Sequence, residues 1–396
     1  MSDLRDLLER LVAIDSVNPA LDPDRAGETE IARFVHDWAE ARGLETTWLE
    51  PASGRPSVLV RAPGRGGGRT LMLNAHLDTV GVAGMAAPFA PRVEDGRVYG
   101  RGAMDMKASL AACLLAAAEA ARRGDLPGDV VVTAVADEEH DSIGTRAALE
   151  AVTADVAVIT EPTDLTLHVA HRGFAVVEVE LTGRASHTSR PDHGVNALRQ
   201  LGRLLAEVER LDAEFRARPP HPLLGHGGWQ PVLASGGREL FTTPDRATVA
   251  LERRTLPGED AAHGAAAEIA AVLQRLADED ATLRPTVRTT VAREAFEADP
   301  DGPAVTAVER AAERVLGRTP ERRGAPYWTD AALVDAAGIP TVLFGPVGGG
   351  IHQPDEWLDL VSAERVLDVL RTLIEDVCAG TRSAEADGGA GTRPGT

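Results

Sequence analysis

The sequence has few of the features on which a secreted or membrane-embedded protein depends. Its two cysteines cannot build a disulfide framework, which favours a reducing compartment. No apolar run reaches the ~18 residues that a membrane helix needs. The N-terminus also lacks the basic and apolar segments of a signal peptide. We therefore expect a cytoplasmic protein with no membrane partner.

Positive charge is scarce as well. The sequence has 41 lysines and arginines against 61 aspartates and glutamates, so its net charge is −20. With no basic stripe to offset this excess, we expect no nucleic-acid partner. Lys107 is the only lysine in the sequence. Its presence is either chance or a sign that a compact ammonium group is needed beside Asp105.

The order of the predicted elements indicates two domains. A chain of 396 residues is too long for one ordinary core. Strands alternate with helices in most of the sequence, which predicts an α/β fold with a mainly parallel central sheet flanked by helices. Residues 173–293 instead predict an inserted α+β module with two helices against an antiparallel sheet. We expect a main domain of residues 1–172 and 294–379, this insert, and a disordered tail at 380–396.

Metal-ligand side chains follow the predicted strands of the main domain. The apolar runs 71–75, 130–136, 156–160 and 340–344 are each followed by such residues: His76 and Asp78, Glu138 and Glu139, Glu161, and His352. In open α/β sheets, ligands bind beyond the carboxyl ends of the strands. Asp105 instead follows a turn with two glycines, where it could cap the next helix or ligate a metal. We expect these side chains to meet in one crevice.

The chemistry of these donors predicts a metal centre. Imidazole with carboxylates, and no thiolate, suits zinc, cobalt or manganese. Two adjacent metals would need a bridging group, for which Asp105 is the candidate. Since neighbouring strand residues point in opposite directions, Glu138 and Glu139 cannot both face one metal, and one of them should act as general base. Asp78 can accept the far ring N–H of His76 and set its tautomer.

Three blocks of sequence resemble the signature of a known family. They are Leu73-Asn74-Ala75-His76-Leu77-Asp78-Thr79-Val80, Gly100-Arg101-Gly102-Ala103-Met104-Asp105-Met106-Lys107 and Asp137-Glu138-Glu139. The family is that of the co-catalytic zinc amidohydrolases and peptidases, which contains acetylornithine deacetylase, succinyl-diaminopimelate desuccinylase, aminoacylase and carboxypeptidase G. The resemblance covers about residues 3–378.

The resemblance implies a role for each donor. Its first Zn²⁺ would be held by His76, Asp105 and Glu161, and its second by Asp105, Glu139 and His352. Glu138 would be the catalytic base and Asp78 would orient His76. Co²⁺ or Mn²⁺ could substitute for zinc. The family often has a cis peptide bond after the bridging aspartate, which here is Asp105–Met106.

The insert resembles the dimerisation or lid domain of the same family. Gly183-Arg184-Ala185-Ser186-His187 carries this resemblance, which implies a homodimer in which His187 reaches the partner's site and stabilises the oxyanion. A surface loop histidine is the alternative. Glu252-Arg253-Arg254-Thr255-Leu256-Pro257 resembles a block whose arginine binds the substrate carboxylate, so Arg254 is the candidate, against an ion pair at a strand edge.

The expected function is hydrolysis of the amide bond of an N-acyl amino acid or small peptide with a free carboxylate. A dipeptidase or carboxypeptidase of the same family is the first alternative. A non-catalytic metal-binding relative is a second, against which the intact Glu138 argues. A metal-free glycosidase with two carboxyl groups is a third. Phe241 stands where many family members have an asparagine, which indicates a more apolar substrate pocket.

Overall fold

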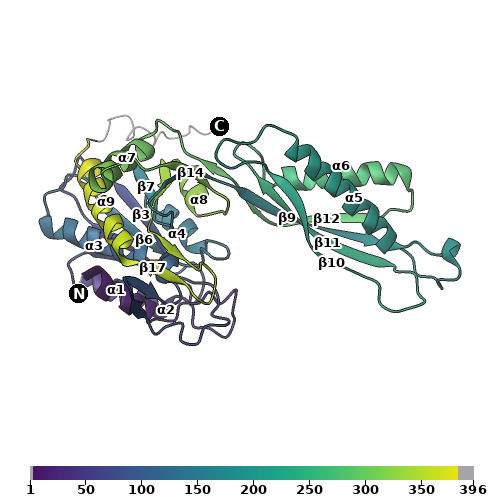
Figure 1. Ribbon diagram of the computed structural model, residues 1–396, viewed down its shortest axis with the longest axis horizontal. Helices are drawn as coiled ribbons and strands as arrows, with labels where there is room; N and C mark the ends of the chain where they lie inside the picture. Colours follow the sequence, from purple (N-terminus) through teal and green to yellow (C-terminus); the bar gives the residue numbers. More distant parts are fainter. Residues whose placement is uncertain (1–2, 382–396) are drawn as a thin grey trace, which may run out of the picture. The chain divides into compact units, whose positions relative to one another are not determined.

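The computed structural model describes residues 3–381, which form two compact units (Figure 1). The first unit comprises residues 3–169, 298–323 and 333–381, and the second comprises residues 170–297 and 324–332. Most of the tail predicted to be disordered, residues 382–396, lies outside the described residues. Gly380, the first residue of the tail predicted at 380–396, is among the described residues and accepts a hydrogen bond from the main-chain N–H of Arg69.

A mixed sheet forms the centre of the first unit, with the strand order β1-β2-β6-β3-β7-β15-β8. Its strands are β1 (Glu45–Leu49), β2 (Ser57–Ala62), β3 (Leu71–His76), β6 (Val130–Val135), β7 (Val156–Ile159), β8 (Leu167–His171) and β15 (Thr341–Leu343). The strands β6, β3, β7 and β15 are parallel, whereas the pairs β1–β2, β2–β6 and β15–β8 are antiparallel. The predicted α/β class is confirmed, with antiparallel strands at both sides of a parallel centre.

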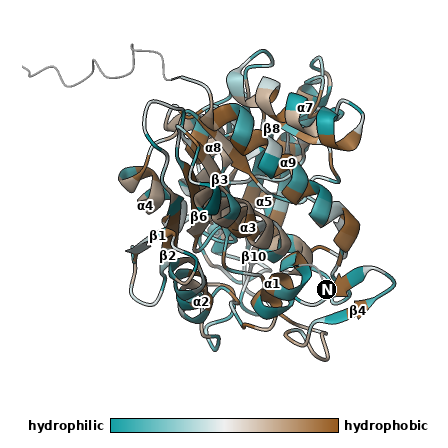
Figure 2. Ribbon diagram, turned by 90° about the vertical axis from the view of Figure 1, so that its left-hand side faces the viewer, coloured by the Kyte–Doolittle hydropathy of each residue, from teal (hydrophilic) through white to brown (hydrophobic). Residues whose placement is uncertain are grey.

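Helices cover this sheet. They are α1 (Asp3–Val12), α2 (Thr29–Glu40), α3 (Ala108–Arg123), α4 (Ile143–Ala151), α7 (Pro303–Leu316), α8 (Ala331–Ala336) and α9 (Leu360–Cys378). Helix α3 packs against β2, β3 and β6, and also contacts α1 and α9 (Figure 2). Because both faces of the parallel strands are covered, β3, β6, β7 and β15 are buried along their whole length.

A small sheet joins two distant parts of the chain. It has the order β16-β17-β5-β4, with β16 (Gly348–Gly349), β17 (Trp357–Asp359), β5 (Arg97–Tyr99) and β4 (Arg92–Glu94). Tyr99 of β5 lies opposite Trp357 of β17. This pairing places the turn after β5 beside the loop that precedes β17.

The second unit has an antiparallel sheet with the order β10-β11-β9-β12. Its elements are β9 (Gly173–Thr182), α5 (Ala197–Arg216), β10 (Gly228–Gly236), β11 (Arg246–Thr255), α6 (Gly264–Glu279) and β12 (Pro285–Arg293). Alternate residues of β9, from Ala175 to Leu181, are buried together with side chains of α5 and α6. The short strands β13 (Phe296–Glu297) and β14 (Arg322–Ala325) both pair with β8.

Two further observations complete the fold. Helix α7 begins at Pro303, at the end of the stretch 295–303 that the sequence predicts to be a linker, and no helix was predicted there. Among the helices of residues 3–381, none is both long enough and apolar enough to cross a lipid bilayer.

Candidate metal centre

Three neighbouring parallel strands deliver four of the predicted donors to one edge of the sheet. His76 is the last residue of β3, Glu138 and Glu139 follow β6, and Glu161 follows β7. Parallel strands end at the same edge, so the four side chains arrive together. Asp105 lies in the turn after β5, and His352 precedes β17. The pairing of these two strands therefore brings Asp105 and His352 together, although 247 positions separate them.

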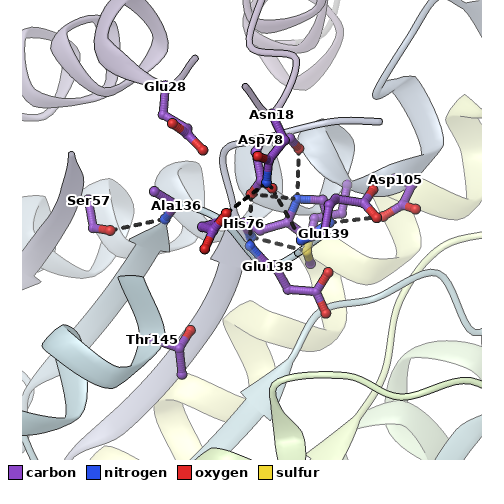
Figure 3. Close-up of polar contacts among 12 residues, drawn as sticks. Asn18, Glu28, Ser57, His76, Asp78, Asp105, Ala136, Glu138, Glu139 and Thr145 are labelled. Atoms are coloured by element: carbon purple, nitrogen blue, oxygen red, sulfur yellow. Dashed lines mark hydrogen bonds and ion pairs between the residues drawn. The ribbon is translucent and has the colours of Figure 1, made fainter. Parts of the chain in front are cut away.

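The two carboxylate oxygens of Asp105 face two different histidines. His76 Nε2 lies 3.0 Å from Oδ1, and His352 Nε2 lies 3.2 Å from Oδ2. Two further carboxylates complete the cluster: Glu139 Oε1 is 3.4 Å from His352 Nε2, and Glu161 Oε1 is 3.9 Å from His76 Nε2. Figure 3 shows Asp105 and Glu139 converging near His76. One carboxylate between two imidazoles is the arrangement that a bridging ligand requires.

Two overlapping sets of side chains could hold metal ions. One is His76, Asp105 and Glu139, and the other is His76, Glu138 and Glu161. The ligand atoms within each set lie within 4.8 Å of one another. Glu139 Oε1 is buried and makes no hydrogen bond, and its contact is the ion pair with His352 at 3.4 Å, where a metal cation could take the place of the imidazolium. The donors therefore fit zinc, cobalt or manganese.

Charge within the cluster changes the pKa values of its members. Burial opposes ionisation of Asp105, but its hydrogen bonds with His352 and His76 outweigh burial and lower the pKa of this carboxyl. Burial likewise opposes protonation of His76, but its hydrogen bond with Asp105 and the charge of Glu161 raise the pKa of the ring well above its usual range. Contacts with Asp105 and Glu139 raise the pKa of His352 to about 10. In the metal-free chain, protons on the two imidazoles thus balance the carboxylates.

Metal binding should therefore release protons. A pH of 7 lies below the pKa of about 10 of His352, so this ring carries a proton, and the raised pKa of His76 favours its protonated form as well. A metal binds only the neutral ring. Up to about two protons should leave per chain, and the apparent affinity should fall as the pH falls. Calorimetric titration of Mn²⁺ into metal-free protein, repeated in buffers of different ionisation enthalpy, measures this release. His352→Gln should reduce it, whereas the exposed His193→Gln should not. Heats that do not depend on the buffer would contradict the prediction.

Asp78 contacts the ring of His76 through its main-chain carbonyl oxygen. The ring Nδ1 donates to the main-chain carbonyl oxygen of Asp78 at 2.8 Å, while the nearer carboxylate oxygen is 3.7 Å away. Asp78 thus accepts the far ring N–H of His76, as predicted, and does so through its main-chain oxygen and not through its carboxylate. The carboxylate is already engaged, because it accepts the main-chain N–H groups of Glu138 and Glu139 at 3.1 and 3.2 Å.

Glu356 holds the turn that carries Asp105, and the sequence analysis missed it. Its buried carboxylate accepts hydrogen bonds from Arg101 Nη1 at 2.6 Å and from the main-chain N–H groups of Gly102, Met104 and Asp105 at 3.0, 2.9 and 3.2 Å. The peptide bond Asp105–Met106 is cis, as the resemblance implies. The only sequence signal was the position of Glu356, four residues after His352, and nothing in the pattern distinguished it from a surface carboxylate.

Glu356→Ala should strongly destabilise the fold. It leaves the Arg101 guanidinium buried without its ion-pair partner and removes the acceptor of three main-chain N–H groups, a loss of about 3–5 kcal/mol. The exposed Glu94, which forms an ion pair with Arg92, is the matched control, and Glu94→Ala should cost at most about 1 kcal/mol. Urea unfolding of both variants measures the difference. Equal effects would mean that the buried contacts of Glu356 contribute no more than an exposed ion pair.

Lys107 is fully buried behind the same turn. Its Nζ donates to the main-chain oxygen of Ile14 at 2.8 Å, and burial lowers the pKa of this ammonium to about 7. The stem lies so close to Gly102, whose φ is +78°, that a Cβ there would come within 3.0 Å of the lysine Cδ. Lys107 therefore links the N-terminal segment to this turn, and its narrow aliphatic chain fits against Gly102 because glycine has no Cβ.

His187 lies on an exposed loop of the second unit. Its Nδ1 accepts the main-chain N–H of Ser189 at 3.1 Å and lies 2.8 Å from Ser189 Oγ. In the neutral ring this leaves the hydrogen on Nε2, which is the form that can donate to an oxyanion. Thr188 N donates to Phe241 O at 2.9 Å, so the exposed Phe241 ring belongs to the neighbouring loop.

Arg254 also belongs to the second unit, on β11. Its Nε donates to Glu252 Oε1 at 2.6 Å. This is an ion pair of the kind that the sequence analysis gave as the alternative to carboxylate binding. Both side chains line a cavity of about 580 Å³, together with Arg172 and His226. Arginine in a concave surface can still bind a carboxylate through its remaining N–H groups.

Comparisons with known proteins match this chain to a family model and to individual proteins. The family model described as "Peptidase family M20/M25/M40" matches residues 72–376. Similar proteins include the acetylornithine deacetylase of Proteus mirabilis, 26% identical over 96% of this chain and 97% of that protein. The succinyl-diaminopimelate desuccinylase of Stenotrophomonas maltophilia is 29% identical over 95% of this chain and 99% of that protein.

Solved structures share the fold. Aminopeptidase PepT from Bacillus cereus has a TM-score of 0.79 at 22% identity, covering 95% of this chain and 98% of that one. Human carnosine dipeptidase 1 has a TM-score of 0.69 at 16% identity, covering 95% and 97%.

Proposed function

Because the chain belongs to peptidase family M20/M25/M40, we propose that it is a two-zinc hydrolase that cleaves the amide bond of an N-acyl amino acid or small peptide. The relatives named above include deacylases and peptidases, which supports this range of substrates. His76, Asp105 and Glu161 would hold one ion, and Asp105, Glu139 and His352 the other. Asp105 would thus be the bridging ligand.

The other residues of the proposed site would each have a separate role in catalysis. Two zinc ions, when bound, would polarise the scissile carbonyl and lower the pKa of the attacking water. Glu138 takes the proton of that water and passes it to the leaving nitrogen. His187 donates its Nε2 hydrogen to the oxyanion, and Arg254 binds the free carboxylate of the substrate. The main-chain carbonyl of Asp78 accepts the Nδ1 hydrogen of His76, which leaves Nε2 free of a hydrogen in the neutral ring, so that this atom could bind a metal ion.

The observation that carries the proposal is the placement of Asp105, with one carboxylate oxygen toward each histidine. The test is elemental analysis of the purified protein, followed by assays on N-acetyl, N-succinyl and N-formyl amino acids and on dipeptides, with and without chelator. We expect about two metal ions per chain and an activity that chelation abolishes and Zn²⁺ or Co²⁺ restores. A fully active metal-free protein would overturn the proposal. Cleavage of dipeptides alone would assign it to the exopeptidases.

We also propose that the enzyme is a homodimer. Strand β10 is an edge of the second unit's sheet, and its side chains Val232 and Leu233 are 46% and 73% exposed. An exposed edge strand with apolar side chains favours pairing with another chain. Light scattering at assay concentration should give twice the 41.7 kDa mass of the chain. A monomer at that concentration would exclude donation of His187 to a partner's site.

A further inference from the structure

A buried polar network lies next to the metal centre, and it includes two side chains that the sequence analysis did not assign to the site. Asn18 is fully buried, and its Nδ2 donates to Asp78 Oδ2 at 2.8 Å and to Asp137 Oδ1 at 3.0 Å. Its Oδ1 accepts from Ala20 N at 2.9 Å and from Arg55 Nη2 at 3.1 Å. Both amide hydrogens and both acceptor positions are thus in use, so the orientation of the amide is fixed.

Arg55 holds the other side of this network. Its guanidinium makes two parallel hydrogen bonds of 2.7 Å to the buried carboxylate of Glu28, and Nη2 donates to Asp137 Oδ1 at 2.7 Å. The Arg55 side chain is only 13% exposed and that of Glu28 is fully buried. A guanidinium held by two bonds to one carboxylate is a rigid support for a second carboxylate.

The network ends on the residues that perform the chemistry. Asp137 precedes Glu138 and has a φ of +69°, a left-handed conformation that its side-chain contacts help to maintain. Asp78 accepts the main-chain N–H groups of Glu138 and Glu139. Asn18 bonds to both aspartates, so it ties together the two groups that fix the backbone of residues 137–139. Figure 3 shows Asn18 beside Asp78, to which it donates.

We propose that Asn18 and Arg55 are positioning residues of this hydrolase, which hold the Asp137–Glu139 segment so that Glu138 and Glu139 keep their separate directions. The inference rests on the proposed function. Neither side chain is among the metal ligands or the base. Asn18 acts through Asp78 and Asp137, and Arg55 acts through Asp137 and Asn18. In other enzymes, loss of a residue that orients a metal ligand costs about 10–100-fold in metal affinity or activity.

The experiment compares Arg55→Gln with Arg61→Gln. Arg61 is the matched control, because it forms ion pairs with Asp129 and Glu45 on the exposed side of β2. Since Arg55→Gln leaves the Glu28 carboxylate buried without its partner, a double variant of Glu28→Gln with Arg55→Gln removes both charges and protects the fold. Asn18→Asp tests the amide, because it places a third carboxylate against two others. Each protein is stripped of metal, titrated with Co²⁺ and assayed for kcat and KM.

We expect kcat to fall about 10–100-fold in the double variant and in Asn18→Asp, with KM within about threefold of wild type. The visible absorption of bound Co²⁺ should shift and its affinity should drop, while Arg61→Gln matches wild type in both. Folded variants with wild-type Co²⁺ spectra and kcat would overturn the inference. So would an activity loss that only follows the folded fraction. If the wild-type protein neither binds Co²⁺ nor cleaves any amide, the proposed function itself fails.

Discussion

Replacing Glu138 with glutamine should lower kcat by about 10²–10⁴-fold, the contribution typical of general acid–base catalysis. The amide has the size of the carboxylate but cannot take a proton from water. Its backbone should stay in place, because Asp78 Oδ1 accepts the N–H of residue 138 at 3.1 Å. We therefore expect wild-type metal content and thermal stability alongside the loss of turnover. Steady-state kinetics and elemental analysis on the same preparation measure both.

The control for this change is Glu150→Gln, on the exposed face of α4, which should leave kcat unaltered. The metal analysis also distinguishes two roles for Glu138, which lies within ligand distance of His76 and Glu161. If the metal content falls together with turnover, Glu138 is a ligand. If turnover stays within a few-fold of wild type, another group is the base.

Asp105→Asn should lower both the metal affinity and the activity. The Asp105 carboxylate contacts both His76 and His352, so the loss of its charge should weaken both proposed metal sites at once. Removing such a ligand should cost several kcal/mol, or roughly 10³-fold in metal affinity, and activity should fall at least as far. In the metal-free chain, the pKa of His352 should also drop toward its usual range, because its contact with the Asp105 carboxylate is the largest cause of the raised value. Calorimetry with Mn²⁺ measures the affinity, and NMR of the imidazole measures the pKa.

Asp95→Asn is the matched control. Asp95 is exposed in the turn between β4 and β5, and its φ of +50° suits asparagine equally well. It should bind metal as the wild type does. Retention of two tightly bound ions by Asp105→Asn would show that the bridge lies elsewhere.

The sequence predicted the part of the site that the central sheet makes. The strands β3, β6 and β7 are covered on both faces, so they read as short apolar runs, and the donors follow directly after them. The meeting of Asp105 with His352 has another origin. It depends on β5 and β17, which have three residues each and no periodicity to detect, so the sequence predicted a shared crevice but not the strand pairing that brings the two residues together.

The sequence could not predict which individual side chains contact each other. Glu356 and Arg55 look like ordinary surface charges in an acidic chain, and burial alone reveals their ion pairs. Helix α7 was missed for a different reason. The stretch 295–303 was interpreted as a linker, but Pro303 at its end is a residue that is also favoured in the first turn of a helix, where its missing N–H costs nothing.

The burial of Lys107 has a practical consequence for handling the protein. Because the sequence has no other lysine and this one is 0% exposed, the folded chain offers no lysine side chain to succinimidyl esters or to aldehyde cross-linkers. Acylation of Lys107 would need the turn behind Asp105 to open. Mass spectrometry of the labelled peptide would then report, at a single amine, how often that opening occurs.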